Sequence, residues 1–288
     1  MRVLVTGAEG QLGFDVVSAL RQRGHDVIGV DYAQMDITDR TAVFSVFSAQ
    51  RPQAVIHCAA YTCVDRAESE PDVCARVNMD GTQYIAQASE SVGAKMIYIS
   101  TDYVYSGDGC DPFPESAPIA PCNVYGKTKY AGEIAAQACS RLFVVRTSWV
   151  FGLHGSNFVR TMLRLSQDRD TLRVVCDQVG SPTFTEDLAE LLCAMIETEK
   201  YGTYNASNAG FCCWHTFAQQ IFTMFGRKVC VIPIPSRDYD SPAVRPKNSR
   251  MSKQALIDAG FTPLPDWKDA LARYVHRFGE ILAQTKQM

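Results

Sequence analysis

The chain has 288 residues, of which 47% are hydrophobic and 20% charged, and its formal net charge at pH 7 is −3. This length and composition suffice for a full α/β core together with a smaller lobe. Because the chain has no basic block, we expect no nucleic-acid partner, and because no apolar run reaches spanning length, we expect no membrane. The first predicted strand begins at residue 3, which leaves no room for a signal peptide, so we expect a cytoplasmic protein.

The cysteines predict neither disulfides nor a metal site. The 11 cysteines are odd in number, scattered, and include no CxxC pair. Several lie in apolar surroundings, where cysteine behaves as a small buried hydrophobe. The run Cys212, Cys213, Trp214, His215 has metal-binding residue types, but adjacent cysteines do not readily share a tetrahedral ion. We interpret this run as helix entry and packing.

The N-terminal segment predicts a strand, a tight turn and a helix that bind a dinucleotide. A short β-branched run leads into glycines spaced GxxGxxG, and an amphipathic segment follows. Gly7 permits the turn, Gly10 lets the backbone approach a pyrophosphate, and Gly13 allows close packing of helix on strand. The N–H groups and the positive dipole end of the helix then face the phosphates. Gln11 and Leu12 lie between these glycines and belong to the predicted cofactor site.

The second predicted strand ends at Asp31, the candidate for binding the adenosine ribose. A carboxylate at this point accepts hydrogen bonds from the ribose and repels a 2′-phosphate. Residues 32–34 supply no Arg or Lys that would neutralise such a phosphate, although Arg40 would soften the effect if it folded back. The cofactor is therefore NADH or NADPH, with NADH favoured. The alternative for Asp31 is a solvated carboxylate in a turn.

The residues after Asp31 are open to two interpretations. Asp36 and Ile37 are placed to reach the edge of the adenine, and we include both in the predicted cofactor site. Thr38 or Asp39 equally suits the N-cap of the next helix, because a short oxygen-bearing side chain there accepts a hydrogen bond from the first helical turn.

Residues 54–60 predict the third strand running into a loop of small residues. Ala59 and Ala60 add little bulk, which suits a backbone that lies along a cofactor. Tyr61 continues the same loop, and all three residues belong to the predicted cofactor site. Ordinary tight packing explains two adjacent alanines equally well.

The fourth predicted strand, residues 95–99, delivers Ser100 and Thr101 at its carboxyl end. In open α/β sheets, ligands bind outside the carboxyl ends of the strands. Thr101 is therefore placed to hydrogen-bond a substrate carbonyl beside Tyr125. The alternative role is local, since a threonine hydroxyl also ends a strand by bonding to the backbone.

The helix predicted after the Gly-, Pro- and Asp-rich segment 103–122 carries Tyr125 and Lys129. Residues four apart lie on one face of a helix, so the phenol and the ammonium are neighbours. A cation about 4 Å away contributes about 4 kcal/mol at an effective dielectric constant near 20, but about 1 kcal/mol in bulk water. The pair therefore predicts a proton donor for carbonyl chemistry if it lies in a covered pocket. The alternative is a surface pair on an ordinary helix.

The alternation of strands and helices predicts an α/β fold with a doubly wound parallel sheet of the Rossmann type. The fifth strand covers residues 142–146, and the alternation loosens after it. We assign residues 1–150 to the dinucleotide-binding domain, to which 181–203 return. Residues 151–180 and 204–288 form mainly a smaller, interleaved substrate-binding lobe, because no linker separates two independent halves.

Eight motifs, in order along nearly the whole chain, resemble the dTDP-4-dehydrorhamnose reductases, a family of extended short-chain dehydrogenases/reductases. The glycine motif and YxxxK mark only the superfamily, whereas VDxAES, RTSWV and RPxNS are much more specific. The motifs are GxxGQLG from Gly7, AYTCVDRAESEP from Ala60, STDYVY from Ser100, NVYGKTKYAGE from Asn123, RTSWVFG from Arg146, NFVRTML from Asn157, DQVGSPT from Asp177 and RPKNSRM from Arg245.

The resemblance implies an activity and a set of catalytic residues. The reaction would be reduction of the 4-keto group of dTDP-4-dehydro-6-deoxy-L-mannose by NADH or NADPH, which gives dTDP-L-rhamnose. Tyr125 would be the general acid toward O4 of the sugar. Lys129 would lower the pKa of Tyr125 and bind the ribose hydroxyls of the nicotinamide, and Thr101 would polarise the substrate oxygen.

The resemblance also implies substrate-binding residues. Asn157, Arg245 and Asn248 lie in later motifs, and we expect Arg245 to contact the diphosphate, because a guanidinium fork suits that geometry. The alternatives are a solvated surface position for Arg245 and a plain core position for Trp149. Four further residues align with positions that line the sugar and nucleotide pocket of the family: Val64, Asp102, Tyr103 and Trp149.

Two other functions of the superfamily stay open. Dehydratases, like the related epimerases, act on similar sugar nucleotides, but they place an acid pair after the catalytic threonine, whereas Asp102 is followed by Tyr103. The regulatory subunit of methionine adenosyltransferase binds a dinucleotide without catalysis, but the intact Thr101, Tyr125 and Lys129 favour an enzyme. The family further implies a homodimer and Mg²⁺ held by glutamates at a dimer contact, for which the spacing assigns no ligands here.

Overall fold

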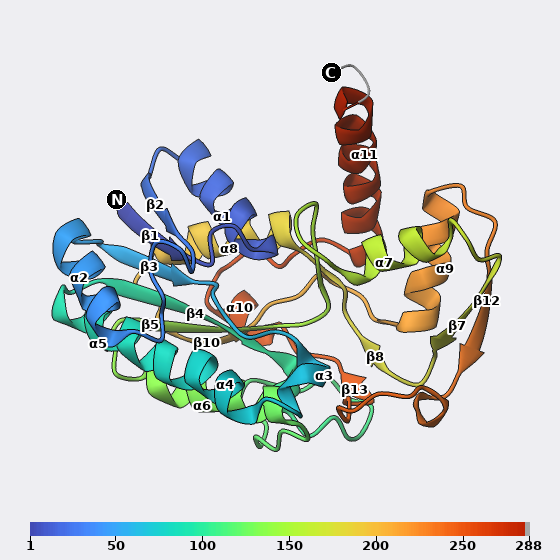
Figure 1. The fold of residues 1–288 in the computed structure, drawn as a ribbon, viewed down its shortest axis with the longest axis horizontal. Coiled ribbons are helices and arrows are strands. Elements are labelled where there is room, and N and C mark those ends of the chain that lie inside the picture. Colours follow the sequence, from blue (N-terminus) through green and yellow to red (C-terminus); the bar gives the residue numbers. More distant parts are fainter. Residues whose placement is uncertain (286–288) are drawn as a thin grey trace.

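The computed structural model describes residues 1–285, and in this part of the chain the large sheet contains six parallel strands. Their order is β10-β5-β4-β3-β1-β2 (Figure 1). The order changes direction between β1 and β3, so the carboxyl ends of these two strands frame the crevice in which such sheets bind ligands. The strands are β1 (Arg2–Thr6), β2 (Asp26–Val30), β3 (Ala54–His57), β4 (Lys95–Thr101), β5 (Leu142–Thr147) and β10 (Gly202–Asn205).

Helices cover both faces of the large sheet (Figure 1). Successive residues of a strand point to opposite faces, and the core follows this alternation. Val3 and Val5 of β1 pack with α1 and α8, whereas Leu4 packs with α2 and α5. The helices are α1 (Gln11–Gln22) and α8 (Thr185–Ile196) on one face, and α2 (Arg40–Gln50), α5 (Thr82–Ser91) and α6 (Val124–Ala136) on the other.

Short elements lie next to the crevice between the larger ones. A π-helical segment between two α-helices places Asn78 under the loop that follows β3, and such segments often occur at functional sites. These short elements are α3 (Val64–Ala67), α4 (Pro71–Ala75), the π-helical segment η1 (Arg76–Gly81) and the 3₁₀ turn η2 (Asp102–Val104). A further 3₁₀ turn, η3 (Ser236–Asp238), belongs to the smaller lobe, where the N–H of Ser236 donates to Asp177 at 2.7 Å.

The smaller lobe is built around an aromatic core. Phe151, Phe184, Phe217 and Tyr274 are buried together there. Figure 1 shows α7, α9, β7 and β12 beside the large sheet, and α11 pointing away from the body of the molecule. Its elements are β6 (Val150–Phe151), α7 (Phe158–Leu165), β7 (Thr171–Val175), β8 (Val179–Gly180), β9 (Thr183–Phe184), β11 (Cys212–Cys213), α9 (Trp214–Met224), β12 (Cys230–Ile234), β13 (Asn248–Ser249) and α11 (Trp267–Thr285).

The chain passes between the two parts more than once. After β9, α8 and β10 join the large sheet, and the chain then enters the smaller lobe again at β11. Helix α10 (Gln254–Asp258) later brings Leu256 against the core beside α1 and α8. The predicted doubly wound, Rossmann-type sheet is therefore confirmed, while the domain boundaries stay an interpretation. Within residues 1–285, none of the helices combines the length and the apolar character needed to cross a membrane.

Candidate active site

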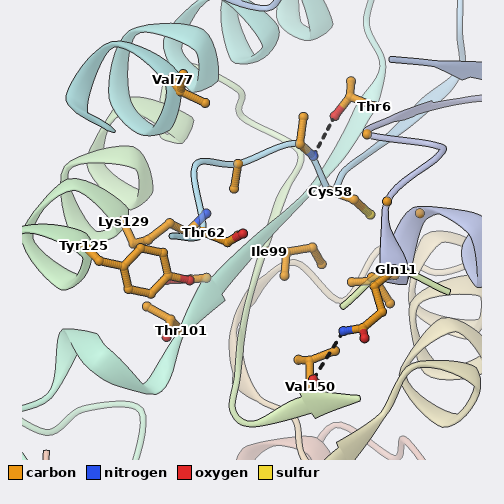
Figure 2. A pocket seen from close by; sticks show the side chains of 18 of the residues that line it. Thr6, Gln11, Cys58, Thr62, Val77, Ile99, Thr101, Tyr125, Lys129 and Val150 are labelled. Carbon is orange, nitrogen blue, oxygen red and sulfur yellow. Dashed lines mark hydrogen bonds between the residues drawn. The ribbon is translucent and has the colours of Figure 1, made fainter. Parts of the chain in front are cut away.

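A cavity of about 1130 Å³ opens at the carboxyl ends of β1, β3, β4 and β5, where the smaller lobe meets the large sheet. Pockets for drug-sized ligands usually measure about 300–1,000 Å³, so this cavity has room for more than one small molecule. Figure 2 shows Thr101, Tyr125 and Lys129 on one side of the pocket, and Gln11 with Val150 on the other. The site thus has two ends, each with its own set of side chains.

The glycine loop forms one end of the cavity, and its geometry explains each glycine. Gly7 has φ +63°, and a Cβ on it would lie 2.8 Å from the backbone nitrogen of Ala59. A Cβ on Gly13 would overlap the carbonyl oxygen of Gly7. Gly10 is the N-cap of α1 and makes no side-chain cap, so the first N–H groups of the helix are available to an anion at the cavity. This cradle fits the pyrophosphate of a dinucleotide.

Asp31 lies on the cavity wall, and its carboxylate is held in place by the backbone. One oxygen accepts from the N–H of Glu9 at 3.0 Å, and the other accepts from the N–H of Tyr32 at 2.8 Å. Arg40 does not fold back toward it, because its guanidinium lies 4.5 Å from the ring centre of Phe44. A carboxylate fixed in this way suits hydrogen bonding to a ribose diol.

The two interpretations of the segment after Asp31 fit different residues within it. Asp36 and Ile37 line the cavity. Asp39 caps α2, because its carboxylate accepts from the N–H groups of Thr41 at 2.8 Å and Ala42 at 3.2 Å. The helix start and the cofactor wall therefore occupy adjacent residues of one turn.

The loop after β3 lies along the cavity, but not with all three predicted residues. Ala59 and Ala60 line the cavity, whereas Tyr61 is not among its lining residues in the described chain. The hydroxyl of Tyr61 donates to Glu70 at 2.6 Å, and Asn78 binds its backbone N–H at 2.8 Å and its carbonyl at 3.1 Å. The side chain of Tyr61 is thus directed to Glu70, and a contact of this residue with the cofactor stays a prediction.

Thr101, Tyr125 and Lys129 meet at the other end of the cavity. Asn123 caps α6 by accepting from the N–H of Gly126 at 2.7 Å, and this fixes the first turn, which carries Tyr125. The ammonium of Lys129 lies 4.2 Å from the ring centre of Tyr98. Thr101 stands at the end of β4, beside Tyr125 in the cavity wall (Figure 2).

The pKa values at this end are set mainly by burial. Burial lowers the pKa of Lys129 from 10.5 to about 7, and the carboxylate of Glu133 acts in the opposite direction. Burial raises the pKa of Tyr125 above its ordinary value of 10.0, while a hydrogen bond with Thr101 opposes the rise. The sequence predicted that Lys129 lowers the pKa of Tyr125. In this structure the loss of solvation is the largest influence on the pKa of Tyr125, and the group that lowers it is Thr101 and not Lys129.

Four residues predicted to bind the sugar nucleotide lie in the cavity wall: Val64, Asp102, Tyr103 and Trp149. Tyr103 packs edge-on against Tyr125, with ring centres 5.7 Å apart. Asp102 is 3% exposed, and burial raises its pKa from 3.8 to about 6, against hydrogen bonds from Ser249 and Thr101. Its Oδ2 has no hydrogen-bond partner among the described residues.

Three other predicted residues are outside the lining of the cavity as far as the chain is described. Asn157 caps α7 and donates to Gln11 Oε1 at 2.8 Å. Arg245 pairs with Asp65 at 2.8 Å, and Asn248 donates to the carbonyl of Asp111 at 2.9 Å. Each of these side chains has a protein partner, and direct contact of the three residues with the substrate stays a prediction.

The sequence interpretation missed Trp214, which lines the cavity from the start of α9. Its ring stacks on Trp149 with centres 3.6 Å apart and planes 10° apart. Trp149 has φ +48°, a left-handed conformation that costs a non-glycine residue roughly 1–2 kcal/mol. A stacked aromatic pair contributes roughly 0.5–1.5 kcal/mol, so the stack largely offsets this strain. No local sequence signal predicts a contact between residues so far apart.

The fold and the cavity define a dinucleotide-binding oxidoreductase of the short-chain dehydrogenase/reductase type, and comparison with known proteins agrees with this class. Residues 1–280 match the family model described as RmlD substrate binding domain. The chain belongs to this family, and the resemblance found in the sequence is confirmed.

Three relatives illustrate the similarity. A dTDP-4-dehydrorhamnose reductase of Streptomyces griseus is 42% identical over 278 residues, which cover 94% of this chain and 91% of that protein. The spore coat polysaccharide biosynthesis protein SpsK of Bacillus subtilis is 40% identical over 275 residues, or 95% and 96% of the two chains. The crystal structure of a Bacillus anthracis dTDP-4-dehydrorhamnose reductase in complex with NADP superposes with a TM-score of 0.94 at 42% identity, and the match covers 96% of this chain and 99% of that chain.

Proposed function

We propose that this protein reduces the 4-keto group of dTDP-4-dehydro-6-deoxy-L-mannose with a reduced nicotinamide dinucleotide, which gives dTDP-L-rhamnose. The observation that carries the proposal is the position of Thr101, Tyr125 and Lys129 in the same cavity as the glycine loop. The reductase relatives, similar over nearly their whole length, support the substrate class. Both supports are needed, because the triad by itself occurs across a wide superfamily.

The residues of the chain perform the proton half of the reaction. The nicotinamide supplies a hydride to C4 of the sugar. Tyr125 donates its proton to O4, so that the ketone gains one hydride and one proton and becomes an alcohol. Burial keeps that proton on the phenol until O4 accepts it. Thr101 donates to O4 and polarises the carbonyl, and Lys129 binds the ribose hydroxyls and stabilises the phenolate that forms.

The preferred cofactor is NADH. The carboxylate of Asp31 is fixed by two backbone N–H groups and would repel a 2′-phosphate. The nearest sequence candidate for neutralising that phosphate, Arg40, is stacked on Phe44. The Bacillus anthracis relative is in complex with NADP. The proposed preference for NADH therefore rests on the Asp31 turn of this chain alone, and substitution of Asp31 tests that turn.

The homodimer, the Mg²⁺ at a dimer contact and the cytoplasmic location stay predictions from the sequence. Within the described chain no group of three or more His, Cys, Asp or Glu side chains is arranged to hold a metal ion. Ligands shared between two chains are a separate question, which gel filtration with and without Mg²⁺ addresses.

The test is turnover of the defined substrate. Purified protein is mixed with dTDP-4-dehydro-6-deoxy-L-mannose and NADH, and the absorbance of the reduced nicotinamide is followed while NMR identifies the sugar product. We expect one NADH consumed per dTDP-L-rhamnose formed. No consumption of NADH, together with tight dinucleotide binding, would contradict the proposal and favour a non-catalytic role.

Tyr125→Phe is the matched variant for the acid assignment. The ring and its packing stay, but the proton donor is lost, so kcat should fall by about 10²–10⁴-fold, the usual contribution of general acid catalysis. NADH affinity, measured by fluorescence titration, should stay within about twofold, since the phenol makes no charged contact with the cofactor. Near-normal turnover would show that another group supplies the proton.

A further inference from the structure

The stacked indoles of Trp149 and Trp214 join the two lobes at the cavity wall. Trp149 follows β5 of the large sheet, and Trp214 begins α9 of the smaller lobe. Their ring centres are 3.6 Å apart, and both residues are half-buried and line the cavity. Since a residue of a hydrophobic core is usually covered on all sides, two indoles that stack and still face the cavity are placed for a ligand.

The position of Trp149 relates the stack to the sugar end of the cavity. Trp149 comes two residues after Thr147, which is the register partner of Thr101. A Cβ on Gly180 would lie 2.8 Å from Cε2 of Trp149, so the indole edge touches β8. Gly180 pairs with Ser249, which neighbours the buried carboxyl of Asp102. The indole therefore lies near the residues that handle the ketone.

Two kinds of contact hold the strained backbone of Trp149. The N–H of Thr183 donates to its carbonyl at 3.1 Å, and Ser148 Oγ donates to the carbonyl of Ser181 at 2.8 Å. These bonds fix the backbone of the turn and make no contact with the indole. The stack on Trp214 fixes the indole itself. A non-glycine residue kept at positive φ beside a cavity is a sign of function.

Trp214 is anchored in turn by the core of the smaller lobe. Phe158 also packs on its ring, with ring centres 4.6 Å apart, and the ring centre of Phe217 lies 6.4 Å away. Because Phe217 is buried, this cluster moves little. The indole of Trp149 thus rests on a rigid support that belongs to the other part of the molecule.

We propose that Trp214 is a positioning residue that holds the indole of Trp149 against the sugar of the substrate, so that the stacked pair forms one apolar wall of the sugar site. This inference rests on the proposed function, because it takes the ligand to be a nucleotide 6-deoxyhexose. Such a sugar presents C–H groups and a methyl group, which pack on an aromatic face. A wall already in place before binding saves the cost of ordering it.

The test uses two variants of Trp214 and a matched control. Trp214→Leu removes the stack, and Trp214→Phe keeps a smaller aromatic ring. Trp267→Phe is the control, because Trp267 is 3% exposed in the same aromatic core. The first readout is far-ultraviolet circular dichroism, in which stacked indoles give an exciton couplet through their strong absorption band. The others are the KM and kcat for the sugar nucleotide and the Kd for NADH.

We expect the couplet to disappear in both Trp214 variants and to persist in Trp267→Phe. In Trp214→Leu the KM for the sugar nucleotide should rise about tenfold, within the range of a lost aromatic pair, while kcat changes less and the Kd for NADH stays the same. Trp214→Phe should recover most of the KM. An unchanged KM in Trp214→Leu would overturn the proposal, as would a KM and a cofactor Kd that rise together in that variant.

Failure of the proposed function would be visible separately. It would appear as a wild-type protein that oxidises no NADH with this sugar. The same variants are then titrated with dTDP-L-rhamnose and with dTDP. Weaker binding of the sugar nucleotide by Trp214→Leu, with equal binding of dTDP, supports the apolar wall. Equal binding of both ligands by wild type and variant overturns it.

Discussion

At the scale of single residues, Asp31 shows how a backbone can prepare a charge for a ligand. The backbone N–H groups of Glu9 and Tyr32 donate hydrogen bonds to its carboxylate, at 3.0 Å and 2.8 Å, and thereby orient it. The orientation cannot relax away from an incoming phosphate without losing these bonds. The proposed preference for NADH over NADPH therefore depends on one side chain, whose carboxylate these two bonds hold in place.

Asp31→Ser should shift the preference toward NADPH. Removing the charge should lower the ratio of kcat/KM for NADH to that for NADPH by about tenfold, which corresponds to about 1.4 kcal/mol and is the order of one charge–charge contact near a protein surface. Steady-state kinetics with both cofactors measures it. Asp39→Ser is the control, because it changes a nearby carboxylate that caps α2 and serine also caps helices. A ratio that moves equally in both variants would contradict the assignment.

The raised pKa of Asp102 predicts how the stability of the folded protein depends on pH. Burial raises its pKa in the folded protein to about 6, above the ordinary value of 3.8, so the folded state binds the proton more tightly than the unfolded state. The cost of burying the charge is therefore present above pH 6, and stability recovers as the pH falls from about 6 toward 4. An ionisable group that weakens the fold at neutral pH is typical of a site kept for function.

Asp102→Asn should consequently be more stable than wild type at pH 8, and that advantage should shrink by about 1.4 kcal/mol at pH 5, where the wild-type carboxyl is mostly protonated in the folded state. Urea unfolding of both proteins at the two pH values gives the difference, and titration of all other groups cancels. A constant difference between pH 5 and pH 8 would show that Asp102 is not the group that titrates.

At the scale of elements, a buried ion pair connects α6 to β4 and β5 beneath the site. Glu133 and Arg146 are joined by two bonds of 2.8 and 2.7 Å, and both side chains are 6% exposed. Ser100 donates to the same carboxylate at 2.5 Å. Ser100 precedes Thr101, and Glu133 lies one turn after Lys129. The pair therefore fixes the distance between the two elements that carry the catalytic side chains.

Glu133→Gln should lower both stability and activity. Breaking a buried pair leaves Arg146 uncompensated and costs roughly 3–5 kcal/mol of the free energy of unfolding. The carboxylate also raises the pKa of Lys129, so its loss should lower that pKa below about 7, and the basic limb of the kcat–pH profile should move to lower pH. Urea unfolding and the kcat–pH profile measure the two effects.

Ser100→Ala provides the comparison for Glu133→Gln. It removes one hydrogen bond to the carboxylate and leaves the charges in place, so it should cost only about 1 kcal/mol and leave the position of the basic limb unchanged. A basic limb that moves equally in both variants would mean that α6 has shifted as a whole, and that the charge of Glu133 is not the cause.

The same elements show what the sequence could predict. Gly7 and Gly13 have roles that depend mainly on the turn and helix next to them, so their spacing was enough to predict these roles. Tyr61 and Trp214 choose partners that are set by the tertiary fold. A tyrosine next to the cofactor loop turns to Glu70, and a tryptophan in a run of cysteines faces the cavity. Strand and helix periodicity predicts which face is buried, but not which distant side chain lies across it.

At the scale of the whole molecule, the cavity is closed by contacts between the two lobes. Gln11 of the glycine loop donates to the carbonyl of Val150 at 3.2 Å and accepts from Asn157 at 2.8 Å. On the opposite side, Asp65 of α3 pairs with Arg245 and accepts from Ser241 at 2.9 Å. Cofactor loop and substrate lobe are therefore in direct contact, and the lobes are held together at the site where the ligands meet.

Arg245 has two candidate roles, contact with the diphosphate of the substrate and joining of the two lobes. A guanidinium that contacts the diphosphate would be freed by Asp65→Asn, so the KM for the sugar nucleotide would stay the same or fall. A guanidinium that serves to join the lobes would lose its function equally in Asp65→Asn and Arg245→Met. The geometry, with the pair formed at 2.8 Å and Arg245 outside the cavity lining of the described chain, favours the second role.

We therefore expect Asp65→Asn and Arg245→Met each to raise this KM by about two- to threefold, and the double variant to raise it no further. The factor is small because the side chains are 22% and 45% exposed for Arg245 and Asp65, and partly exposed pairs contribute about 0.2–1 kcal/mol. Steady-state kinetics of the four proteins forms a double-mutant cycle, whose coupling isolates the pair. A KM that rises only in Arg245→Met would show that the guanidinium contacts the substrate.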